Sequence, residues 1–102
     1  MSNDNLVTLS SRPKLAGFAR LQRDASRDRW VLQAPERVLV LDQTSKEILD
    51  HCTGQATVEA IIKALAGEYD APRDVIEHDV LAVLELLAEK MFLIVENKHG
   101  RD

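Results

Sequence analysis

The sequence predicts an α+β domain with a winged-helix-like order, in which a three-stranded antiparallel sheet is followed by three helices. Apolar residues recur with a strand period before about residue 42 and with a helical period after it. A proline-containing turn also separates two short runs rich in β-branched and aromatic residues. At 102 residues the chain is a single domain. We expect it to span residues 16–96, with a disordered head at 1–15 and a flexible tail at 97–102, because both ends are mostly polar.

The predicted sheet is built around a hairpin. Its strands are Trp30–Gln33 and Arg37–Leu41, and the proline between them belongs in the turn because it has no N–H to donate. An earlier strand is expected over Gly17–Arg23, where side chains alternate. We expect Trp30 to be largely buried between sheet and helices. The second hairpin strand is apolar on both faces, so it is either covered on both or lies at an edge that another segment covers.

Three helices are predicted after the hairpin. The first begins with a capping-box pattern in which Thr44 is the N-cap. The second begins at Thr57. The third opens at Asp70-Ala71-Pro72, where the missing proline N–H costs nothing, and should run to about Lys90. Phe92–Val95 then forms a short closing strand or an extended tail packed on the core.

The third helix carries two apolar stripes when its residues are placed at helical spacing. The broader arc should face the core and consists of Ile76, Val80, Leu81, Val83, Leu84, Leu87, Ala88 and Met91. The second stripe lies roughly opposite and consists of Val75, Asp79, Ala82 and Leu86. Either it forms the wall of a groove or its apolar members are incidental at the surface.

The sequence contains no recognisable catalytic constellation. The histidines are scattered without metal-ligand spacing, the single cysteine is predicted to be structural, and the glycines form no phosphate-binding loop. We therefore expect no enzyme activity, no catalytic residue, no metal and no cofactor. No signal peptide or long apolar run is present, so a cytoplasmic protein without a membrane association is expected.

Charge is distributed unevenly along the chain. Residues 12–37 hold seven basic and three acidic residues, whereas residues 38–95 hold four basic and eleven acidic ones. This asymmetry suits a module that docks to a partner with oriented charge, although a solvated surface could carry it by chance. A nucleic-acid-binding winged helix is the alternative function. The predicted third helix is mostly acidic, however, and phosphates would repel it.

The hairpin sequence resembles the PqqD family. The pattern W-x-L-x-x-P-E-R over Trp30–Arg37 is followed by an apolar strand into Leu41-Asp42, and matching positions continue into the last helix. The resemblance covers about Gly17 to Leu93. It implies a non-catalytic peptide chaperone of pyrroloquinoline quinone biosynthesis, a recognition element for leader regions of ribosomally made peptides. The implied partners are the precursor peptide PqqA and the radical SAM enzyme PqqE, to which the domain presents the peptide.

In that family the peptide adds as a further strand beside the last hairpin strand, in a cleft against the third helix. An unpaired edge of this kind supplies backbone hydrogen bonds, and neighbouring pockets supply selectivity. The same edge could also pair with a second copy of the chain to form a homodimer. The expected peptide-binding residues are Arg37, Val38, Leu39, Val40, Leu41, Val75, Asp79, Ala82, Val83 and Leu86.

Overall fold

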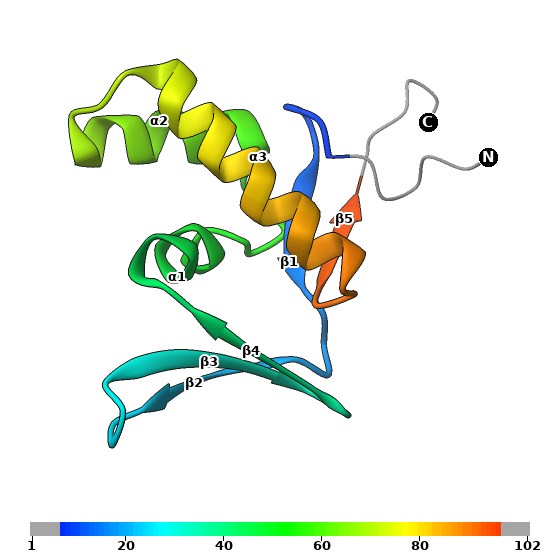
Figure 1. The fold of residues 1–102 in the computed structure, drawn as a ribbon. Coiled ribbons are helices and arrows are strands. Elements are labelled where there is room, and N and C mark those ends of the chain that lie inside the picture. The colour runs from blue at the N-terminus through cyan, green and yellow to red at the C-terminus, as the bar shows by residue number, and fades with distance from the viewer. Residues whose placement is uncertain (1–6, 97–102) are drawn as a thin grey trace.

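A computed structural model of the chain describes residues 7–96 (Figure 1). The described part contains five strands and three helices, which confirms the α+β class. Residues 1–6 of the predicted head and the predicted tail at 97–102 lie outside the described residues. In chain order the elements are β1 (Arg12–Leu15), β2 (Arg20–Asp24), β3 (Arg29–Ala34), β4 (Arg37–Leu41), α1 (Gln43–Asp50), α2 (Val58–Tyr69), α3 (Arg73–Glu89) and β5 (Leu93–Glu96).

The predicted three-stranded sheet is confirmed, with antiparallel order β2-β3-β4. In the hairpin Ala34 pairs with Arg37 across a turn formed by Pro35 and Glu36. Glu36 has a φ of 64°, which is the left-handed conformation found at the third position of a type II turn after proline. β2 begins later than expected because a turn precedes it, in which the N–H of Ala19 bonds to the carbonyl of Ala16 at 2.9 Å.

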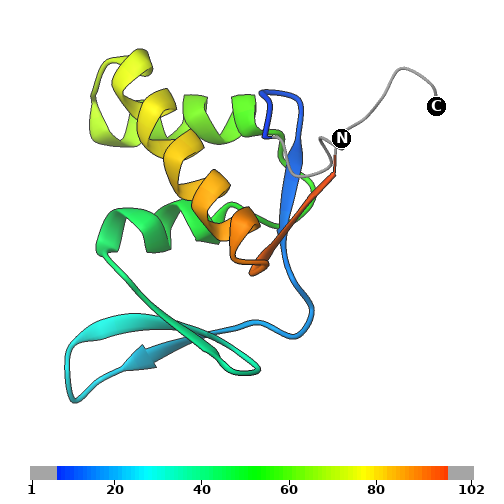
Figure 2. The same ribbon diagram turned by 45° about the vertical axis from the view of Figure 1, so that its right-hand side comes forward.

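The expectation of a disordered head reaching residue 15 is wrong at its C-terminal end. Residues Arg12–Leu15 form β1, which pairs antiparallel with β5 (Figure 2). The N–H of Gly54 donates to the carbonyl of Pro13 at 2.9 Å, and Gly54 has a φ of 87° that favours glycine. The closing strand therefore pairs with a segment almost eighty residues away and not with the hairpin.

Two of the three predicted helix starts are close to those observed, and one is wrong. Thr57 is the N-cap of α2, where its hydroxyl accepts the N–H of Ala60. Pro72 directly precedes α3 as its N-cap. The N-cap of α1, however, is Asp42 and not Thr44: the carboxylate of Asp42 accepts the N–H of Ser45 at 2.8 Å. Aspartate is preferred over threonine at the N-cap, so the observed start agrees with the local preference.

The helices cover one face of the β2-β3-β4 sheet, as both ribbon views show (Figures 1 and 2). Fully buried side chains from the sheet and from each helix meet there, among them Leu32, Ile48, Ile61 and Leu84. Trp30 packs against the margin of this core and keeps part of its surface exposed, so it is less completely buried than the core residues. Its ring faces two cations, with the Nζ of Lys46 4.4 Å and the guanidinium carbon of Arg23 5.7 Å from the ring centroid.

Candidate functional site

The edge of β4 is unpaired within residues 7–96, where β4 pairs with β3 alone. Because the hairpin loop has two residues, Ala34 and Arg37 must be a pair that bond each other's N–H and C=O groups. This arrangement alternates along an antiparallel ladder, so Leu39 and Leu41 also direct their backbone groups to β3. The N–H and C=O groups of Val38 and Val40 therefore point away from the sheet, where a further strand could bond to them.

The two faces of β4 differ in their environment. Val38 and Val40 lie on the face away from the helices and are 66% and 50% exposed. Leu39 is partly buried on the helix side, and the side chain of Leu41 is in the core. The strand is thus apolar on both faces for two reasons: one face completes the core, and the other is open to solvent.

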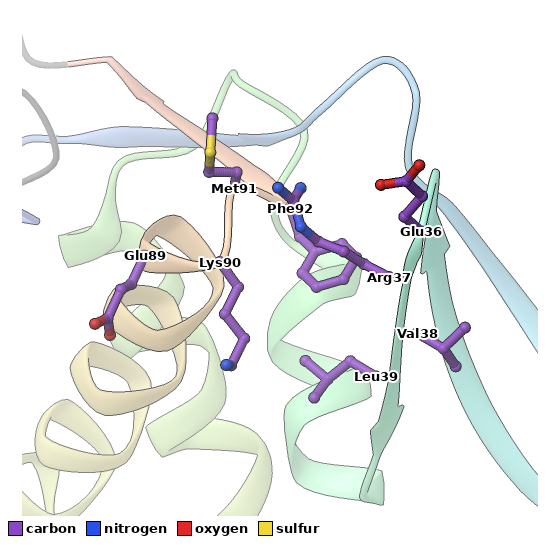
Figure 3. A pocket seen from close by; sticks show the side chains of 8 residues that line it. All are labelled: Glu36, Arg37, Val38, Leu39, Glu89, Lys90, Met91 and Phe92. Atoms are coloured by element: carbon purple, nitrogen blue, oxygen red, sulfur yellow. The ribbon is translucent and has the colours of Figure 1, made fainter.

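A hollow of about 440 Å³ lies between the start of β4 and the end of α3 (Figure 3). Its lining residues are Glu36, Arg37, Val38, Leu39, Glu89, Lys90, Met91 and Phe92. Leu39 and the buried Phe92 give it an apolar floor, while Arg37 and Lys90 extend into the gap from opposite sides. The hollow therefore combines apolar contact area with two cationic groups and with the carboxylates of Glu36 and Glu89.

A second hollow, of about 300 Å³, lies between the start of α1 and the middle of α3. Its lining residues are Asp42, Thr44, Ser45, His78, Asp79, Ala82 and Val83. The hydrogen bond from the backbone N–H of Ser45 lowers the pKa of Asp42, so this carboxylate is ionised at neutral pH. The second hollow is therefore lined by carboxylates without Lys or Arg, whereas the first is lined by residues of both signs.

One line of side chains on α3 joins the two hollows. Asp79, Val83, Leu86 and Lys90 follow each other at intervals of four, three and four residues, which places them on one helix face. Leu86 lies between the hollows on this line and is 43% exposed. We call the space bounded by this line and by Arg37 and Leu39 the β4–α3 groove.

The structure brings most of the expected site residues to the groove, but not all of them. Six of them line the two hollows, namely Arg37, Val38, Leu39, Asp79, Ala82 and Val83, and Leu86 lies between the hollows. Val40 and Leu41 line neither hollow. Val75 lines neither of the two hollows, because it is near the start of α3, away from the sheet (Figure 1). The exposure of the predicted second stripe is confirmed: its members are all exposed on the surface of α3.

The residues at and after the end of α3 line the first hollow but are not among the expected peptide-binding residues. Met91 was assigned to the core arc and is 59% exposed, so that assignment is wrong. Met91 has a φ of 66°, so the chain leaves the helix there, and the side chain of the next residue, Phe92, is buried while that of Met91 is not. Lys90, four residues after Leu86, could have been found by continuing the second stripe by one turn.

Across residues 7–96, no three His, Cys, Asp or Glu side chains are grouped so that they could hold a metal ion. Burial raises the pKa of the Cys52 thiol to about 12, and its Sγ donates to the carbonyl of Ile48, so the sulfur is a structural group. No helix in this part of the chain is long and apolar enough to cross a membrane.

An exposed strand edge beside a groove is the arrangement that the addition of an extended peptide as a further strand requires. The chain belongs to the PqqD family: the family model for coenzyme PQQ synthesis protein D matches residues 29–93. Curated relatives named PqqA binding protein include one from Rhodopseudomonas palustris strain TIE-1, 52% identical over 85% of each chain. Another, from Bradyrhizobium diazoefficiens, is 45% identical over 85% of this chain and 84% of its own.

Two solved structures share the fold. One is the solution structure of the PqqD truncation of Methylobacterium extorquens PqqCD, a functional, stand-alone recognition element for ribosomally synthesised and modified peptides. It is 34% identical, covers 94% of this chain and all of its own, and has a TM-score of 0.77. The other is the crystal structure of PqqD from Xanthomonas campestris, 35% identical over 90% of this chain and 96% of its own, with a TM-score of 0.54.

Proposed function

We propose that this chain is a non-catalytic chaperone that binds the precursor peptide PqqA and presents it to the radical SAM enzyme PqqE. The relatives named PqqA binding protein and the recognition element from Methylobacterium extorquens support the peptide as ligand. Because precursor peptides are made by ribosomes, the proposal places the protein in the cytoplasm.

The peptide binds by adding a strand to the free edge of β4, inside the β4–α3 groove. The observation that carries this mode is the outward direction of the backbone groups of Val38 and Val40. The added strand runs antiparallel to β4. The existing sheet is purely antiparallel, and such pairs are commoner and slightly more stable than parallel ones.

Hydrogen exchange tests the strand addition at single residues. At protein concentrations where the chain is monomeric, saturating PqqA peptide should slow exchange of the Val38 and Val40 amides strongly, since within residues 7–96 of one chain their N–H groups have no partner strand. The amides of Leu39 and Leu41 bond to β3 already and serve as internal controls. Equal protection along the whole strand, or protection confined to α3, would contradict strand addition at this edge.

A proline substitution tests the link to PqqE. Val40→Pro removes one outward N–H, and proline is tolerated on edge strands where the N–H faces away from the sheet. The variant should stay folded but support less PqqE-catalysed modification of PqqA than wild type does. Val40→Ala keeps the N–H and is the matched control. Equal modification of PqqA with both variants would show that the N–H of residue 40 at the β4 edge is not needed.

Without peptide, the same edge pairs with a second copy of the chain. Val38 and Val40 are exposed beside unpaired backbone groups, a combination that favours edge-to-edge association. A homodimer of this kind would compete with the peptide, since both need the same backbone groups.

The alternative, a nucleic-acid-binding winged helix, conflicts with the charge of α3. This helix carries five acidic residues against one arginine. That arginine, Arg73, is already paired with Glu59 and Glu77. Since this arginine is paired, α3 offers no other Lys or Arg between Arg73 and Glu89 to neutralise the phosphates on which nucleic-acid affinity depends.

A further inference from the structure

The two ends of the β4–α3 groove differ in the charged side chains that line them. At the first hollow, Arg37 and Lys90 extend into the gap from β4 and from the end of α3, and the carboxylates of Glu36 and Glu89 belong to the rim (Figure 3). Neither Arg37 nor Lys90 forms an ion pair with any residue from 7 to 96. Both cations are therefore available to a ligand.

At the second hollow the available charges are carboxylates. Asp42 and Asp79 line it from α1 and α3, and Asp79 has no ion pair among the described residues. The positive end of the short α1 helix partly offsets this charge, but Asp42 already accepts the N–H of Ser45 there. His78 is the one other titratable side chain that lines this hollow.

Between the two ends the groove is apolar. Leu39 from β4 and Val83 and Leu86 from α3 bound this middle part, and none of them is fully buried. A ligand that fills the groove thus meets carboxylates, then apolar side chains, then cations.

The strand and the helix give the same distance between the charged ends. Arg37 and Asp42 are five residues apart, about 17 Å along a strand. Lys90 and Asp79 are eleven residues apart, also about 17 Å along a helix, and at 100° per residue they differ by about 20° around its axis. A peptide strand covers this length in about five residues. Only every second side chain of an added strand faces the groove. A side chain at one charged end and a side chain at the other are therefore separated by an even number of positions, either four or six.

From this arrangement we propose that the bound peptide carries a basic side chain four or six positions before an acidic one, with apolar groove-facing side chains between. The order follows from the antiparallel direction: the N-terminal end of the added strand lies beside Asp42 and Asp79, and its C-terminal end beside Arg37 and Lys90. Charges at the two ends of a groove fix register and direction more than they add affinity. The inference rests on the proposed strand addition and specifies the ligand that this mode selects.

A charge scan of the PqqA peptide tests the inference. Each acidic and each basic peptide residue is changed singly to glutamine and titrated against four proteins: wild type, the double variant Arg37→Gln/Lys90→Gln, Asp79→Asn and the control Glu68→Gln. One acidic position should weaken binding by about two- to fivefold with wild type, as expected for a partly exposed ion pair. The same change should have no effect with the double variant.

A basic position four or six residues earlier in the peptide should show the same coupling to Asp79. Glu68→Gln should leave both couplings intact, because Glu68 is on α2 and lines neither hollow. If the peptide binds and protects Val38 and Val40 but no charge is coupled, or the acid precedes the base, the charge pattern is refuted while strand addition stands. If the peptide neither binds nor protects these amides, the proposed function fails and this inference with it.

Discussion

Leu86→Ala and Leu84→Ala should separate peptide binding from folding, although the two leucines are two residues apart on α3. Leu84 is 0% exposed in the core, whereas Leu86 is 43% exposed on the groove side. Full burial of a leucine side chain contributes about 1.5–3 kcal/mol, and a peptide can cover no more than the exposed fraction. Loss of the Leu86 side chain should therefore weaken binding by about 0.6–1.3 kcal/mol, or about three- to ninefold in Kd.

The stability of the two variants should differ in the opposite sense. Leu84→Ala leaves a cavity in the core and should cost about 2–5 kcal/mol of unfolding free energy. Leu86→Ala removes only contacts that are half-covered in the free protein, and alanine has the higher helix propensity, so its cost should be about 1 kcal/mol.

Calorimetric titration with PqqA peptide, in conditions where denaturant melts show both variants to be folded, measures the two effects separately. Leu84→Ala should then bind with nearly the wild-type Kd, because its side chain does not reach the groove. Normal binding by Leu86→Ala would show that this stripe of α3 is not a groove wall. A stability loss equal to that of Leu84→Ala would show that Leu86 belongs to the core.

Three further outcomes are expected. Sedimentation should show a dimer that dissociates as PqqA peptide is added, and a dimer that persists at saturation would place the contact away from β4. Trp30→Ala should lower the unfolding free energy by less than the roughly 3–5 kcal/mol typical of a buried tryptophan, because the ring is only partly buried. A larger loss in a denaturant melt would show that Trp30 contributes as a core residue does. The pKa of Asp42 is lowered in the folded protein, so its ionised carboxylate adds to the free energy of unfolding above the unfolded pKa of about 3.9. This stabilisation is lost as pH falls through the pKa of the folded state. Asp42→Asn keeps the cap, so its stability deficit should shrink below about pH 4, and a pH-independent deficit would contradict this role.

The local elements of this protein follow from its sequence. The hairpin is predicted because Pro35-Glu36 lies between two β-rich runs, and turn chemistry of this kind acts over only a few residues. The exposed stripe on α3 is predicted because helical spacing alone decides which side chains share a face. Leu84 and Leu86 therefore occupy opposite environments as expected.

Contacts between distant segments were decided only by the tertiary structure. β1 pairs with β5 almost eighty residues later, and its four residues carry no pattern that marks a strand on its own. The left-handed turn at Met91 buries Phe92, and Lys90 just before it faces Arg37 across the gap (Figure 3). Each charged end of the groove combines side chains from two elements that are distant in the sequence. Tertiary packing brings these side chains together, and spacing along one element could not predict it.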